Sequence, residues 1–166
     1  MKRLLLDSGV AADFINRRRG IFEQVKERVS QGVRVGIGVP VLAELAYGIE
    51  HSQHRDRNMQ SLLSSLPALA LWPFDRSAAF TYGRIAAELR RAGRPMQSND
   101  IMIAAIALTL GSCLIATTDS DLDAISGLSI EHWRKCRPTI RRLARPPGPP
   151  APHLRSRADC GIDVVK

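Results

Sequence analysis

The stretch Lys2-Arg3-Leu4-Leu5-Leu6-Asp7-Ser8-Gly9-Val10 is an apolar run that ends in a carboxylate and two small residues. This pattern predicts a buried strand with Asp7 at its carboxyl end. In open α/β sheets, ligands bind outside the carboxyl ends of parallel strands, where the strand order reverses. Asp7 is therefore a candidate site residue. Taken alone, however, it is better explained as the cap of the following helix through an Asx turn.

Length and composition indicate one folded unit. The 166 residues, 45% of them hydrophobic, suffice for one ordinary core. No apolar run approaches the roughly 18–20 residues that span a bilayer, and the opening run is too short for a signal peptide. We therefore expect a cytoplasmic protein without membrane contact. Three widely spaced cysteines without CxxC spacing argue against a disulfide framework or a zinc site, and Cys113 is expected to be buried.

The net charge of +8 is concentrated at the carboxyl end. Residues 134–166 contain nine of the 24 lysines and arginines but two of the 16 acids, so residues 1–133 are almost neutral. The tail is also rich in proline. We expect a folded domain at 1–133 and a basic, disordered tail at 134–166, with at most one helix at 134–145. Arginine clusters at 17–19, 55–57 and 90–94 are expected to form solvated faces rather than a phosphate-binding groove.

Apolar periodicity and breaker residues predict alternating strands and helices. Strands are expected at 2–6, 33–37, 69–72, 112–117 and 128–130, and helices at 10–15, 21–29, 40–49, 51–66, 76–92 and 101–110. Trp133 is expected to cover the side of the sheet. Right-handed crossovers then give an α/β fold of three layers, in which helices flank a mostly parallel central sheet.

Three further acids are predicted to reach the same edge as Asp7. The second apolar run ends in Thr117-Thr118-Asp119-Ser120-Asp121, Asp100 stands at the head of a helix that is apolar nearly all round, and Glu44 lies about one turn into its helix. Each acid has a separate structural explanation. For Asp100 it is stabilisation of a helix N-terminus, worth about 0.3–1 kcal/mol.

The separate structural explanations become less convincing when the four acids are considered together. Four converging acids without a lysine, arginine or histidine would repel one another by several kcal/mol unless they bound protons or a cation. Ligand sets made of oxygen alone suit Mg²⁺ or Mn²⁺ and do not suit zinc. The sequence therefore predicts a divalent metal site.

Four segments carry a family resemblance. Leu4-Leu5-Leu6-Asp7-Ser8, Val41-Leu42-Ala43-Glu44-Leu45, Asn99-Asp100-Ile101-Met102-Ile103-Ala104-Ala105 and Thr117-Thr118-Asp119-Ser120-Asp121 resemble the ordered acidic motifs of PIN-domain ribonucleases, specifically the VapC-like toxins of type II toxin–antitoxin systems. The resemblance extends from residue 2 to residue 133. It departs from the family at Ser8, where threonine is frequent, and at Leu122, where phenylalanine is frequent.

The resemblance implies a Mg²⁺-dependent endoribonuclease that acts as a toxin. Asp7 and Asp100 would be direct metal ligands, and Glu44 and Asp119 would complete the catalytic site directly or through water. The implied partners are an RNA substrate, a cognate antitoxin and a second copy of the chain.

The family motifs also contain residues that would support the acids. Thr117, Ser8 and Asn99 are candidates for orienting the carboxylates. The role of Asp121 stays open between support of the site and a turn or helix cap.

Two other functions compete with this interpretation. A catalytically inactive PIN-like module that binds RNA or protein would keep the fold without the reaction, and the four intact acids argue against it. A receiver-like phosphoacceptor domain would need a lysine at the end of a later strand. The lysines, Lys2, Lys26, Lys135 and Lys166, do not occupy such a position.

Overall fold

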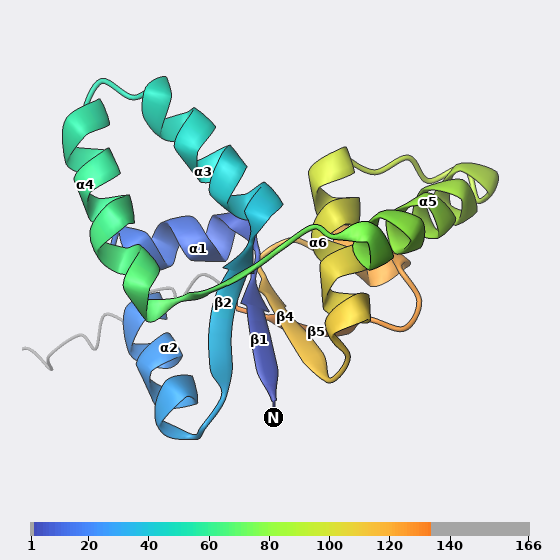
Figure 1. The fold of residues 1–166 in the computed structure, drawn as a ribbon, viewed down its shortest axis with the longest axis horizontal. Coiled ribbons are helices and arrows are strands. Elements are labelled where there is room, and N and C mark those ends of the chain that lie inside the picture. Colours follow the sequence, from blue (N-terminus) through green and yellow to red (C-terminus); the bar gives the residue numbers. More distant parts are fainter. Residues whose placement is uncertain (1, 134–166) are drawn as a thin grey trace, which may run out of the picture.

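A five-stranded, entirely parallel sheet forms the centre of the structure, a computed structural model that describes residues 2–133 (Figure 1). The strands are β1 (Arg3–Leu6), β2 (Arg34–Gly38), β3 (Ala70–Trp72), β4 (Cys113–Thr117) and β5 (Ser129–His132), in the order β3-β2-β1-β4-β5. The predicted three-layer α/β fold is confirmed. The domain boundary at 133 and the predicted tail, including the helix at 134–145, concern residues outside the described part.

The opening strand is the centre of this sheet. β1 pairs with β2 on one side and with β4 on the other, and Leu4, Leu5 and Leu6 are at most 1% exposed. A continuous apolar run suits this position because both faces of the strand are covered. The chain builds the sheet outward from β1 in one direction through β3, then returns to β4 on its other side. The strand order therefore switches at β1, the place where open α/β sheets bind ligands.

Within residues 2–133, six helices and two short 3-10 turns connect the strands. The helices are α1 (Ser8–Ile15), α2 (Ile21–Ser30), α3 (Val39–Glu50), α4 (Arg55–Ser65), α5 (Arg76–Arg91) and α6 (Ser98–Leu110), and the 3-10 turns are η1 (Leu66–Ala68) and η2 (Asp121–Ala124). Figure 1 shows α3 and α4 rising on one side of the sheet and α5 and α6 on the other. As its composition predicts, α6 is deeply buried, with Ile103, Ala104 and Ala105 fully covered.

Two predicted helix boundaries are wrong. Residues 51–54 form a turn rather than helix, because the Ser52 hydroxyl accepts hydrogen bonds from the His54 backbone N–H at 3.1 Å and the Asn58 amide at 2.8 Å. Such local side-chain bonds compete with helical backbone bonds. Helix α6 begins at Ser98, with Gln97 as its N-cap, so Asp100 lies inside the first turn and is not a capping residue.

Other details agree with the sequence. Cys113 is a buried free thiol and Trp133 is 4% exposed, as predicted. No helix in residues 2–133 has the length and apolar character needed to cross a bilayer.

The close approach of β2 and β3 requires glycine at position 36. A Cβ added there would overlap the carbonyl oxygen of Ala70, its strand partner, and would lie 2.7 Å from the carbonyl carbon. We predict that Gly36→Ala lowers the free energy of unfolding by about 2–4 kcal/mol in a denaturant titration, because the backbone of a strand must move. Gly48→Ala is the matched control, since, apart from its chain neighbours and its own helix backbone, no atom of the described structure lies within 4 Å of its added Cβ. Equal stability of the two variants would contradict the prediction.

Candidate active site

The predicted acids come from four segments at the carboxyl edge of the central strands. Asp7 follows β1 and Asp119 follows β4, and these strands are direct neighbours in register, with Leu6 opposite Ala116. Helix α3 contributes Glu44 from its second turn, and the first turn of α6 contributes Asp100.

Asp7 is the most buried of these acids, with 9% of its surface exposed. Its Oδ1 accepts the Ser8 backbone N–H at 2.7 Å, and its Oδ2 accepts the buried Thr117 hydroxyl at 2.8 Å. Burial raises the pKa of Asp7, while these two hydrogen bonds oppose the rise. Asp7 also caps α1. Asp7 therefore has the helix-capping role expected for a lone aspartate, and it also lies at the candidate site.

Hydrogen bonds connect Asp7 to the segment that follows β4. The Thr117 hydroxyl accepts the Asp119 backbone N–H at 3.0 Å, and Asp119 Oδ1 accepts the Asp121 backbone N–H at 3.2 Å. Thr117 thus contacts two of the predicted site segments at once. Its predicted role in orienting a carboxylate agrees with these bonds.

Glu44 is exposed but held in place from two other helices. Its Oε2 accepts the Ser8 hydroxyl at 2.7 Å and the Asn99 side-chain amide at 3.2 Å. These bonds join α3 to α1 and α6. Ser8 and Asn99, both suggested as orienting residues, contact Glu44 rather than Asp7 or Asp100 through their side chains.

The pKa of Asp100 is affected by all the other acids of the cluster. Burial, which is the largest cause, and the charges of Asp7, Asp119, Glu44 and Asp121 together raise the pKa of Asp100 to about 6. Asp121, whose role the sequence left open, is therefore close enough to Asp100 to raise its pKa. Strongly shifted carboxylates that influence one another are typical of functional sites.

The donor chemistry fits a hard divalent cation. The ion pairs in residues 2–133 use Asp13, Glu50, Asp56, Asp123 and Glu131, so none of them neutralises the four predicted acids. Within the same residues, no three His, Cys, Asp or Glu side chains are already arranged to hold a metal ion. The site therefore suits a divalent cation through its oxygen donors and its uncompensated negative charge, and not through a preformed set of metal ligands.

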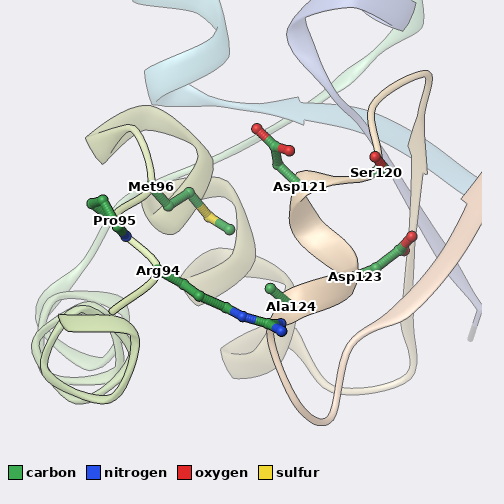
Figure 2. A pocket seen from close by; sticks show the side chains of 7 residues that line it. All are labelled: Arg94, Pro95, Met96, Ser120, Asp121, Asp123 and Ala124. Carbon is green, nitrogen blue, oxygen red and sulfur yellow. The ribbon is translucent and has the colours of Figure 1, made fainter. Parts of the chain in front are cut away.

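A hollow of about 390 Å³ is lined in part by Ser120 and Asp121, which follow Asp119 in the chain. It lies between the loop at 94–96, which precedes α6, and the segment at 120–124, which follows β4 (Figure 2). Sequence reasoning missed it, although its loop stands directly before the Asp100 motif. Of the arginine clusters expected to form solvated faces, Arg94 lines this hollow, while Arg17, Arg18 and Arg57 line a separate groove beside α4.

Known proteins similar to this chain are nucleases. Residues 4–128 match the family model of the PIN domain. The chain is 31% identical over 135 residues to the tRNA(fMet)-specific endonuclease VapC of Shigella flexneri, covering 80% of this chain and 99% of that protein. It is 28% identical over 131 residues to Ribonuclease VapC2 of Rickettsia felis, covering 79% and 98%.

A solved structure has the same fold. The crystal structure of VapBC2 from Rickettsia felis, bound to a DNA fragment from their promoter, aligns with a TM-score of 0.73 at 25% identity. The alignment covers 79% of this chain and 98% of the compared chain.

We predict that Asp100→Asn stabilises the metal-free protein at neutral pH. The folded protein keeps the Asp100 proton up to about pH 6, whereas an ordinary aspartate releases it near 3.8, so stability falls as the pH rises between these values. Because Asp100 is only half-buried, solvent screening reduces the gain to about 1 kcal/mol, or a few degrees in Tm.

Thermal unfolding in the presence of EDTA, at pH 7 and near pH 3.8, measures this effect. The gain should be much smaller at the lower pH, where Asp100 is protonated in the folded state and already half protonated in the unfolded state. Asp56→Asn, at an exposed carboxylate on α4, is the matched control. A gain in Tm that is the same at both pH values would contradict the assignment.

Proposed function

The chain belongs to the PIN-domain family, and on this premise we propose that it is a metal-dependent endoribonuclease that acts as the toxin of a toxin–antitoxin pair. The main support is the convergence of four acids, Asp7, Glu44, Asp100 and Asp119, at the edge where the strand order switches. Their negative charges repel one another there. The similarity to VapC ribonucleases over most of the chain adds to it.

We propose Mg²⁺ or Mn²⁺ as the cofactor, held by Asp7 and Asp100 with help from Glu44 and Asp119. When bound, such an ion lowers the pKa of a water ligand and offsets charge on a phosphate. The protein's own part is to orient the acids. Thr117 fixes one oxygen of Asp7, and Ser8 and Asn99 fix one oxygen of Glu44.

The substrate that we propose is RNA. One relative is named a ribonuclease and another a tRNA(fMet)-specific endonuclease, which makes transfer RNA the first substrate to test. Residues 2–133 carry almost no net charge, so shape and individual basic contacts, rather than overall attraction, would select the RNA.

We further propose a cognate antitoxin that covers the acidic edge, a homodimer, and a cytoplasmic location. The solved structures similar to this chain include a member of the VapBC family of toxin–antitoxin systems. On helix α3, Val41 is buried, whereas Tyr47 is 68% exposed one turn beyond Glu44. Tyr47 is thus available to a partner that reaches the acids along α3, and apolar surface of this kind suits a protein interface.

Cleavage should depend on the acids. We predict that Asp7→Asn and Asp100→Asn each reduce RNA cleavage at least about 100-fold, because each removes a charge that would hold the ion and stabilise the transition state. Purified variants are incubated with a transfer RNA pool and the new RNA ends are sequenced. Asp56→Asn keeps full activity as the control. Wild-type cleavage in both site variants would refute the nuclease site, and a folded wild-type protein without any cleavage would favour the inactive binding module.

Metal should also stabilise the fold. We predict that saturating Mg²⁺ or Mn²⁺ raises the Tm of the wild-type protein by several degrees, since a ligand at 100 times its Kd contributes about 2.7 kcal/mol. EDTA should reverse the shift and abolish cleavage. In Asp100→Asn the shift should be clearly smaller, because less repulsion remains to be relieved. Equal shifts in both proteins would place the metal elsewhere.

A further inference from the structure

The hollow between 94–96 and 120–124 has the chemistry of a base-binding pocket. Its lining residues are Arg94, Pro95, Met96, Ser120, Asp121, Asp123 and Ala124. Figure 2 shows Arg94 and Met96 extending from their loop toward the 120–124 segment, with Asp121 on the opposite rim. The volume of about 390 Å³ lies in the range of sites for single small ligands.

The charged groups of the hollow differ in their availability. Asp123 already contacts His132 at 3.0 Å, whereas Arg94 forms no ion pair within residues 2–133. An arginine offers a planar fork of donors that suits base edges and phosphate oxygens. Asp121, at the rim, offers acceptors. A ligand with both donors and acceptors on a planar frame would match this arrangement.

The apolar lining indicates more than a phosphate site. Met96 is half-buried and packs against the core, and together with Pro95 and Ala124 it gives the hollow an apolar surface. Methionine adapts its shape and makes favourable contacts with aromatic rings. A phosphate alone would gain nothing from these surfaces, whereas the face of a nucleobase would.

The hollow is built from segments that are adjacent in the chain to two of the proposed catalytic acids. Its two walls are the segments that lead into Asp100 and out of Asp119, and the Asp121 backbone N–H bonds to Asp119 at 3.2 Å. A nucleotide placed here would therefore be a direct neighbour of a phosphate at the acids. Sequence-specific RNA recognition commonly uses unpaired bases that are turned out of the strand in this way.

We propose that this hollow receives one unpaired RNA base next to the cleaved phosphate, with Met96 against its face and Arg94 donating to its edge. It is a specificity pocket of the proposed nuclease, and the inference depends on that function. Arg94 and Met96 act in substrate selection and leave the chemistry to the acids.

The test measures RNA binding separately from cleavage. Full-length protein carrying Asp7→Asn is titrated with short, unstructured oligoribonucleotides that differ in a single base, and fluorescence anisotropy gives the Kd. Arg94→Ala and Met96→Ala should each weaken binding about tenfold and remove the base preference at one position. In the active protein, the same changes should raise KM more than they lower kcat.

Two controls separate the pocket from general charge and from folding. Arg91→Ala removes the same charge from the exposed last turn of α5, outside the hollow, and should leave the base preference intact. Arg94→Lys retains the charge and should recover affinity without the base preference, because lysine lacks the planar fork. Thermal unfolding identifies any variant whose fold is disturbed.

The outcomes distinguish this inference from the nuclease proposal. Base preference that survives both Arg94→Ala and Arg94→Lys, or equal loss of affinity in Arg94→Ala and Arg91→Ala, would overturn the pocket. Wild-type protein and Asp7→Asn with the same cleavage would overturn the nuclease function. In that case the titration still decides whether the hollow binds a base.

Discussion

The hydrogen bond from the Thr117 hydroxyl to Asp7 is the interaction on which the arrangement of the site depends. Thr117 is fully buried and Asp7 nearly so, and their 2.8 Å bond joins the carboxyl ends of β1 and β4. Without it, a buried carboxylate oxygen would lack a partner at a cost of about 1–3 kcal/mol. The bond also opposes the effect of burial on the Asp7 pKa, so it favours a charged acid at a desolvated position.

The other acids gather around this point at the expense of stability. Glu44 and Asp119 both raise the pKa of Asp7, and all three raise that of Asp100. A fold selected for stability alone would replace at least one of them with a neutral residue. Their presence together is understandable if an ion with two positive charges offsets the repulsion during function. The family membership and the electrostatics thus support the same function by independent routes.

The sequence predicts the strands and the two acids that follow β1 and β4 well, because a strand buried on both faces must be continuously apolar. The sequence predicts less well where side-chain hydrogen bonds replace the backbone hydrogen bonds of a helix. The helix expected at 51–54 is replaced by a Ser52-centred turn, because one side-chain oxygen satisfies two donors. The bonds of Ser8 and Asn99 to Glu44, and the hollow lined by Arg94 and Met96, depend on how distant helices pack. No periodicity in the sequence encodes such contacts.

The separation in sequence between Asp7 and its partner has a consequence for biosynthesis. The two residues of the central hydrogen bond are 110 positions apart, and the strand that begins the chain gains its β4 neighbour last but one. During translation, Asp7 leaves the ribosome long before Thr117 is synthesised. An incomplete chain released before that point lacks both the anchor of its first acid and the segment that carries Asp119. The proposed site can therefore be assembled only when the domain is almost complete.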